Sequence, residues 1–195
     1  KVDNTGVFVE KSGTRIYRLI YNDSTYEYAS ASMTALVPEI GFPSITRIAV
    51  QRQPDTRIHC VRGDGTVAIM IDDPVEEVSC WIDVEIGGDG FVEDVFVMPG
   101  NAEDSVYYLV KRTIDGDTVR YLERWALESE CQGGTLNKQA DSFVLYSGAS
   151  TTAISGLDHL EGEDVIVWGD GMYNGSYTVS GGAITLATAV SEAVI

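Results

Sequence analysis

The residue types that could carry out catalysis lie together near the C-terminal end of the chain. Ser155, Asp158 and His159 are the residue types of a hydrolase triad, in which a base removes the proton of a nucleophile. A triad takes these groups from separate elements and holds the nucleophile on a strained turn, whereas here they are almost adjacent and no Gly-x-Ser-x-Gly motif occurs. We therefore interpret the segment as a capped turn before a strand that begins at Asp164, and we predict no catalytic residues.

The possible metal ligands are His59, Cys60, Cys80 and Cys131, and their spacing does not match a zinc site, because no Cys-x-x-Cys or His-x-x-x-His pair is present. His59 and Cys60 are neighbours in a predicted strand, so their side chains should point to opposite faces. Three cysteines leave at least one free thiol. Cys60 and Cys80 lie in apolar, strand-like runs, which predicts buried free thiols and fits a reducing origin. We predict no metal site and no cofactor.

Asp-Gly pairs raise the possibility of calcium binding, but the Asp-x-Asp-x-Asp-Gly loop with its trailing Glu is absent. We interpret Asp64-Gly65 and Asp170-Gly171 as hairpin turns that need a positive φ. The same turn accounts for Arg62-Gly63-Asp64, which spells an integrin-type tripeptide. No glycine-rich loop opens a helix, so the sequence has no phosphate-binding loop.

Several aromatic residues lie in β-rich runs, where we expect core or cross-strand packing rather than a ligand platform. These residues are Tyr17, Trp81, Tyr107, Trp125 and Trp168.

The charge of the chain excludes some partners. Its 195 residues include 13 basic and 30 acidic side chains, which give a net charge of −17. Binding to nucleic acid depends on Lys and Arg, so tight binding of DNA is not expected, and acidic membrane surfaces should repel the chain. No apolar run approaches the roughly 20 residues of a membrane span. The 44% of hydrophobic residues is typical of a folded domain.

Strand patterns dominate the elements that must position these residues, and one pattern occurs twice. Each copy has a strand, a polar loop, a second strand, an Asp-Gly turn and a third strand, over residues 45–84 and 92–125. The copies are about 45 residues apart, which is the period of propeller blades. A hairpin at 7–21 with Tyr26–Tyr28 would supply outer strands of a preceding blade, and residues 30–38 are the best candidate for a short helix that Pro38 and Gly41 end.

The predicted fold is all-β, with partial β-propeller-like blades followed by a small β barrel or sandwich. We assign residues 1–130 to about two and a half blades, 131–141 to a linker, and 142–195 to the small C-terminal module. Propellers typically need four or more blades. The N-terminus lacks an initiator Met, and we therefore expect a fragment of a longer polypeptide.

Six runs of the sequence show a family resemblance: Ile48–Asp55, Val61–Thr66, Gly88–Glu93, Thr118–Glu123, Ser155–Gly162 and Thr178–Leu186. They resemble phage tail proteins, specifically the nozzle, or tail tubular protein B-like, component of short-tailed phages and prophages. The resemblance covers nearly the whole chain, and 156–162 is its most specific piece.

This resemblance implies a non-enzymatic structural protein of the virion tail, made in the cytoplasm of the bacterial host. Such nozzles contain β-propeller and small β domains and form a ring, usually a hexamer, around the DNA exit channel. The implied partners are copies of the same chain and neighbouring tail or adaptor proteins, while DNA passes without specific binding. A negative lumen would repel the phosphate backbone. The alternative is a carbohydrate- or receptor-binding β module of a tail; a cell-wall hydrolase is disfavoured because no pair of carboxylates occurs in a plausible cleft motif.

Overall fold

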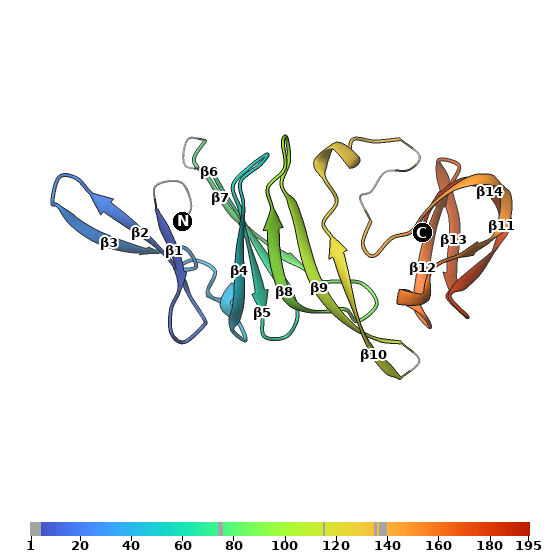
Figure 1. The fold of residues 1–195 in the computed structure, drawn as a ribbon, viewed down its shortest axis with the longest axis horizontal. Coiled ribbons are helices and arrows are strands. Elements are labelled where there is room, and N and C mark those ends of the chain that lie inside the picture. The colour runs from blue at the N-terminus through green and yellow to red at the C-terminus, as the bar shows by residue number, and fades with distance from the viewer. Residues whose placement is uncertain (1–4, 74–75, 115, 135, 137–139) are drawn as a thin grey trace. The chain divides into compact units, whose positions relative to one another are not determined.

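A computed structural model describes residues 5–73, 76–114, 116–134, 136 and 140–195. Within these residues the chain is all-β, as the sequence predicts, and its helical elements are three short 3₁₀ helices (Figure 1). The elements are β1 (Gly6–Val9), β2 (Ile16–Asn22), β3 (Glu27–Ser32), η1 (Pro38–Gly41), β4 (Ile45–Gln51), β5 (Arg57–Arg62), β6 (Val67–Asp73), β7 (Val78–Val84), β8 (Phe91–Met98), β9 (Ser105–Ile114), β10 (Asp117–Arg124), η2 (Glu128–Glu130), β11 (Leu145–Ser155), η3 (Asp158–Leu160), β12 (Asp164–Gly169), β13 (Met172–Thr178) and β14 (Ala183–Val194).

The strands form four sheets, which we number in chain order. The first three have the orders β1-β2-β3, β4-β5-β6-β7 and β10-β9-β8, in which strands consecutive in sequence are paired. This order is consistent with the predicted blade-like units. The fourth sheet has the order β11-β14-β12-β13, and none of the four closes into a barrel.

The chain divides into two compact units. Unit 1 comprises residues 1–85, 91–110 and 122–125, and unit 2 comprises residues 86–90, 111–121 and 126–195. The predicted domain limits of 1–130 and 142–195 stay a prediction. Part of the predicted linker, residues 135 and 137–139, lies outside the described residues, as do Asp115 of the predicted turn and residues 1–4.

In unit 1 the second sheet is covered on both faces. One face carries Ile58 and Met70 and packs against Val9 and Ile16 of the first sheet, within one apolar core. Alternation along β5 then turns His59 to the other face, where the third sheet lies. β8 lies against β4 and β5 there (Figure 1). The three sheets therefore form a stack.

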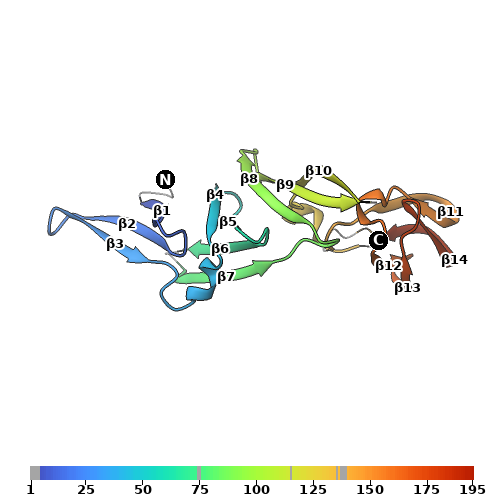
Figure 2. The ribbon, with the colours of Figure 1, turned by 90° about the horizontal axis from the view of Figure 1, so that it is seen from below.

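The segment at 30–38 differs from its prediction as a short helix. β3 continues to Ser32, and the chain then bends until the 3₁₀ helix η1 begins at Pro38. Ala31 and Ser32 pair with Arg18 and Tyr17 of β2, so the first part of the segment forms strand hydrogen bonds. The sheet edge that β2 offers decides the conformation here, rather than the helix propensity of alanine. Figure 2 shows β2 and β3 extending together beyond the shorter β1.

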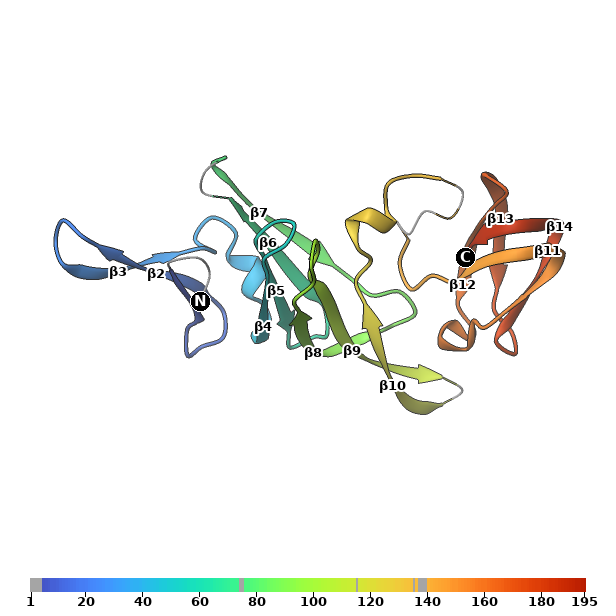
Figure 3. The ribbon, with the colours of Figure 1, turned by 45° about the horizontal axis from the view of Figure 1, so that its top comes forward.

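Unit 2 contains the fourth sheet with its own apolar core. Alternate residues of β12 point inward, with Val165 and Val167 buried and Ile166 exposed. β11 and β14 pair along most of their length with bulges near Thr151, and they lie side by side (Figure 3). The core residues are Ile154, Leu157, Leu160, Val165, Val167, Val179, Ile184, Leu186, Val190, Ala193 and Ile195.

Candidate functional site

A chain of hydrogen bonds between buried polar side chains joins the second and third sheets of unit 1. His59 in β5 is fully buried, with its Nδ1 atom 2.6 Å from the hydroxyl of Tyr108 in β9. Its Nε2 atom lies 3.1 Å from Oε1 of Gln51 in β4. The amide nitrogen of Gln51 donates to the carbonyl of Gln53, 2.9 Å away, which leaves Oε1 as the acceptor. His59 therefore donates from Nε2 and accepts the Tyr108 proton at Nδ1, and the neutral ring satisfies both bonds.

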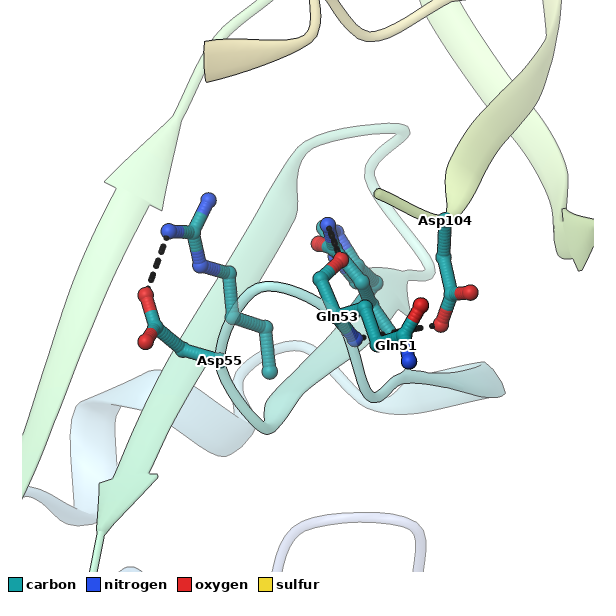
Figure 4. Close-up of polar contacts among 6 residues, drawn as sticks. Gln51, Gln53, Asp55 and Asp104 are labelled. Carbon is teal, nitrogen blue, oxygen red and sulfur yellow. Dashed lines mark hydrogen bonds and ion pairs between the residues drawn. The ribbon is translucent and has the colours of Figure 1, made fainter. Parts of the chain in front are cut away.

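The chain of hydrogen bonds continues to Asp104, which fixes the loop between β4 and β5. Its Oδ2 atom accepts the backbone N–H groups of Arg52 at 2.8 Å and Gln53 at 3.2 Å, and its own N–H donates to the carbonyl of Gln53 at 3.0 Å. Oδ1 accepts the N–H of Gly100 at 3.2 Å. Figure 4 shows Asp104 turned toward the loop at Gln53. The carboxylate thereby ties the loop after β4 to the loop before β9.

Burial sets the protonation states of this site. Desolvation, with a smaller contribution from the Arg57 charge, lowers the pKa of His59 from its ordinary 6.5 to about 4, so the ring is neutral at pH 7. Desolvation also raises the pKa of Tyr108. For Asp104, desolvation alone would raise the pKa, but the N–H bonds from Arg52, Gly100 and Gln53 together lower it. Each group is held in the state that its hydrogen bonds require.

The rings of this site pack edge to face. Trp125 lies 6.3 Å from His59 and 6.2 Å from Tyr108 between ring centroids, with interplanar angles of 70° and 69°. The N–H of Trp125 donates to Val106 in β9. Both nitrogens of His59 already have partners, so the arrangement is suited to positioning two sheets. We define Gln51, His59, Asp104, Tyr108 and Trp125 as the inter-sheet link.

A pocket of about 340 Å³ lies beside this link. Its charged acceptor is Asp104, which already binds three backbone N–H groups. Asp55, on the same loop, forms an ion pair with Arg57 at 2.9 Å (Figure 4). The carboxylate that lines the pocket, Asp104, and the neighbouring carboxylate of Asp55 are therefore both already engaged in contacts within or to this loop. The pocket is lined by Val50, Arg52, Gln53, Val97, Pro99, Gly100 and Asp104.

In unit 2 a buried arginine holds the loop before β8. Arg112 of β9 is 1% exposed and donates to the carbonyls of Gly87 and Gly88 and to the hydroxyl of Ser142. The N–H of Gly87 donates in turn to the carboxylate of Asp141 at 2.7 Å. Arg112 and Asp141 thereby bind residues 86–90 to the segment that enters the fourth sheet.

Segments 156–162 and 178–186 contact each other in unit 2. Glu161 accepts the N–H groups of Gly181 and Gly182 at 2.8 and 2.7 Å. Leu157 donates its N–H to the carbonyl of Gly182, and Gly162 donates to that of Val179. We call these contacts between 156–162 and 178–186 the motif clip. The Glu161 carboxylate therefore caps the turn at Gly181 and Gly182.

The three residues whose types occur in hydrolase triads, Ser155, Asp158 and His159, lie in the motif clip or next to it. His159 Nε2 lies 2.9 Å from the carbonyl oxygen of Ser142, and its ring contacts that of Tyr121. Ser155 ends β11 and pairs with Ala183 of β14. Asp158 begins η3 next to Gly182. This is a short 3₁₀ turn before β12, at the position of the predicted capped turn, but among the described residues no side-chain hydrogen bond caps it.

His59 and Cys60 point to opposite faces of the second sheet, as predicted, since His59 contacts Tyr108 and Cys60 lies in the core shared with the first sheet. Burial raises the pKa of the Cys60 thiol to about 12. The prediction that Cys80 is buried is wrong: β7 is an edge strand and Cys80 is exposed. Cys131 is partly buried, and no disulfide joins any of the three cysteines. Among the described residues no group of three or more His, Cys, Asp or Glu side chains could hold a metal ion.

The Asp-Gly pairs form the predicted turns. Gly65 and Gly171 have φ values of +84° and +81°, and Asp170 has a positive φ of 47°. Asp64 accepts the N–H and hydroxyl of Thr66 at 3.1 and 2.6 Å, so its carboxylate holds the turn in place.

The aromatic residues confirm the packing prediction in most cases. Tyr17 stacks on Phe8 of the neighbouring strand. Tyr107 stacks on Phe96, and Trp81 donates its indole N–H to the carbonyl of Met33. Trp168 is 48% exposed and therefore lies outside the core, opposite Tyr173 of β13.

Comparison of the chain with models of known protein families and with curated proteins gives no match in either case. No helix in the described part of the chain is long and apolar enough to span a membrane.

Proposed function

We propose that this chain is a non-enzymatic structural component of a phage tail, similar to the nozzle, that assembles with copies of itself around a DNA exit channel. The motif clip is the observation that carries this proposal. Two of the sequence runs that resemble tail proteins meet there, and Glu161 accepts the N–H groups of Gly181 and Gly182 in the clip.

The charge distribution supports passage of DNA without binding. The chain carries 30 acidic and 13 basic residues, and such a surface repels phosphates. Basic side chains also serve internal contacts, since Arg112 binds Gly87 and Gly88, and Arg18 pairs with the buried Asp72. Arg112 therefore stabilises a loop and Arg18 stabilises the packing of two sheets.

Cryo-electron microscopy of particles from the organism that carries the gene tests the proposal. The expected result is a ring of this chain in the tail, with acidic side chains toward the lumen. A tail without density for the chain contradicts the proposal, and a ring with carboxylates on the outside only contradicts the proposed negative lumen. Anisotropy of a labelled DNA duplex at low salt should stay constant as the chain is added.

A second candidate function, a carbohydrate-binding module, is favoured by one observation in the fourth sheet. Trp168 and Tyr173 are partners across β12 and β13, and they are 48% and 61% exposed. Exposed aromatic side chains offer an apolar face and, in Tyr173, a hydroxyl group, which suits the binding of sugar rings. Glycan-array binding that is lost in W168A, and retained when the buried-face neighbour is conservatively changed in V167I, would favour this function.

A further inference from the structure

The fourth sheet contains an asparagine–glycine pair, Asn174 and Gly175, inside strand β13. Of the five asparagines in the chain, Asn174 alone is followed by glycine. In such a pair the backbone nitrogen of the glycine can attack the side-chain amide carbon of the asparagine, because no Cβ on the second residue hinders the approach. Asparagine–glycine pairs are usual in hairpin turns, whereas this pair lies within a strand. Its surroundings therefore decide whether the two groups react.

A β-bulge takes Asn174 out of the regular strand ladder. Gly175 lies opposite Val167 of β12, but the next pair is Trp168↔Tyr173, so Asn174 is the extra residue between them. Gly175 has a φ of +124°, which L side chains rarely adopt. The peptide between the two residues is thus released from the regular geometry that pairing imposes on the rest of the strand.

The hydroxyl of Tyr177 contacts both groups that would react. It donates to the side-chain Oδ1 atom of Asn174 at 3.2 Å and to the backbone carbonyl oxygen of the same residue at 2.8 Å. The hydroxyl oxygen accepts the N–H of Ala187 in β14 at 3.1 Å, which directs its hydrogen toward Asn174. A Cβ at Gly175 would come within 3.1 Å of this oxygen, so the Tyr177 side chain lies directly against the glycine.

Both hydrogen bonds of Tyr177 favour attack by the glycine nitrogen. The backbone carbonyl of Asn174 belongs to the same peptide group as the nitrogen of Gly175, so a donor on its oxygen stabilises the negative charge that this group acquires as the N–H loses its proton. The donor on Oδ1 stabilises the charge that develops there as the amide carbon becomes tetrahedral. One hydroxyl therefore assists the nucleophile and the electrophile together.

We propose that Asn174 is a site of spontaneous deamidation, promoted in the folded chain by the Tyr177 hydroxyl. The nitrogen of Gly175 forms a bond to Cγ of Asn174, and the bond between Cγ and Nδ2 breaks. Nδ2 leaves as ammonia with the proton that the glycine nitrogen gives up. Water then opens the resulting succinimide at either of its carbonyl groups, which leaves aspartate or isoaspartate at position 174. The reaction needs no oxidant or reductant.

The product changes an outer strand of the fourth sheet, since β13 is the last strand in the order β11-β14-β12-β13. Either product adds a carboxylate to a chain that already carries a net charge of −17. Isoaspartate also inserts a methylene group into the backbone of the strand. None of this rests on the proposed function.

Peptide mapping by mass spectrometry, on samples taken over several days at pH 8, tests the site. The native wild type should gain the mass of deamidation at Asn174 faster than at Asn22, whose Oδ1 accepts the N–H of Ser24 and which is followed by aspartate. Y177F keeps the ring and removes the hydroxyl, so it should slow the native reaction on the order of tenfold. Y146F removes another hydroxyl of the fourth sheet, one that donates to the carbonyl of Ala149, and should react like the wild type.

The same measurement in urea separates the fold from the local sequence. Unfolded wild type and Y177F should react at equal rates, because the Tyr177 hydroxyl acts only where the fold places it. Isoaspartate in the product, detected with isoaspartyl methyltransferase, identifies the succinimide route, since direct hydrolysis of the amide gives aspartate alone. N174D should show no mass gain at this position, and circular dichroism confirms that each variant is folded.

Four results overturn the inference. They are a native chain without mass gain at Asn174, aspartate without isoaspartate in the product, equal native rates in wild type and Y177F, and a faster native reaction in Y177F. The last result would mean that the hydroxyl protects the amide. If Y177F does not fold, the native wild-type rate is compared with the rate in urea, and a native rate that is equal or lower overturns the inference.

Discussion

Replacing His59 by glutamine tests whether the inter-sheet link depends on a neutral imidazole. His59 donates to Gln51 and accepts from Tyr108, and these two bonds need one protonated and one unprotonated ring nitrogen. Protonation would place a second N–H against the Tyr108 hydroxyl and a charge in a fully buried position. The folded chain should therefore resist protonation well below the ordinary pKa of histidine.

The sign and size of the effect follow from proton linkage. Desolvation and the Arg57 charge lower the pKa of His59 from 6.5 to about 4 in the folded chain, while the unfolded chain keeps the ordinary value. Between these two pKa values the unfolded state binds more protons, so the free energy of unfolding falls as the pH falls. At 1.36 kcal/mol for each pKa unit, His59 should remove about 3 kcal/mol of stability between pH 6.5 and pH 4. Above pH 6.5 its contribution is constant.

Urea unfolding of the wild type and H59Q at pH 4, 5, 6 and 7 measures this contribution. H59Q should lower stability at pH 7, because glutamine cannot reproduce the ring packing on Trp125. Its stability should then decline less steeply below pH 6.5, so that the two curves converge by about 3 kcal/mol. Parallel curves would refute the reasoning.

Three further predictions concern other parts of the fold. Gly181 and Gly182 both have a positive φ, so G181A should lower the free energy of unfolding by about 1 kcal/mol. G182A should lower it by more, because a Cβ at Gly182 would also come within 2.5 Å of Asp158. Chemical denaturation measures both variants. R112M should destabilise the chain by about 2 kcal/mol or more in the same assay, since it removes the donors to Gly87, Gly88 and Ser142. Native chain treated with Ellman's reagent at pH 8 should react at the exposed Cys80, while the buried Cys60, whose pKa is about 12, reacts after unfolding.

Each of these has a result that contradicts it. Equal losses in G181A and G182A would mean that the turn moves away from Asp158. R47M removes an arginine whose ion pair with Asp94 is more than half exposed, so it should change stability by at most about 0.5 kcal/mol; an equal loss in R112M and R47M would refute a special role for the buried arginine. Reaction of Cys60 at the rate of Cys80 in the native chain would show that the core of unit 1 opens readily.

The parts of the fold that follow local rules could be predicted from the sequence. Alternating apolar residues gave strands, and Asp-Gly pairs gave turns such as those at Gly65 and Gly171. The opposite orientation of His59 and Cys60 followed from the strand period alone. The prediction of a helix at 30–38 was wrong because it relied on the helix propensity of alanine, whereas pairing with β2 decides the conformation of Ala31 and Ser32.

The inter-sheet link depends on partners that the sequence does not bring together. His59 and Tyr108 are 49 residues apart, and Asp104 and Gln53 are 51 residues apart. A local signal did exist, since His59 is a polar residue between Ile58 and Cys60 in an apolar strand, and a buried polar group requires a partner. The pattern could indicate that need but not which residue meets it. Cys80 was misassigned for a related reason, because an apolar run does not reveal that β7 is an edge strand.

The acidic residues fall into two groups: carboxylates that hold turns and loops in place, and exposed carboxylates that contribute only to the surface charge. Asp64, Asp104, Asp170 and Glu161 accept backbone N–H groups in turns and loops. Carboxylates bound in this way are fixed by folding, and neutralising them should lower stability before it alters any interaction with DNA. A test of electrostatic repulsion must therefore change exposed carboxylates that hold no turn. Glu27, which is exposed in β3, is one such position. If passage of DNA depends on the negative surface, substitutions of this second kind should alter it while the fold remains intact.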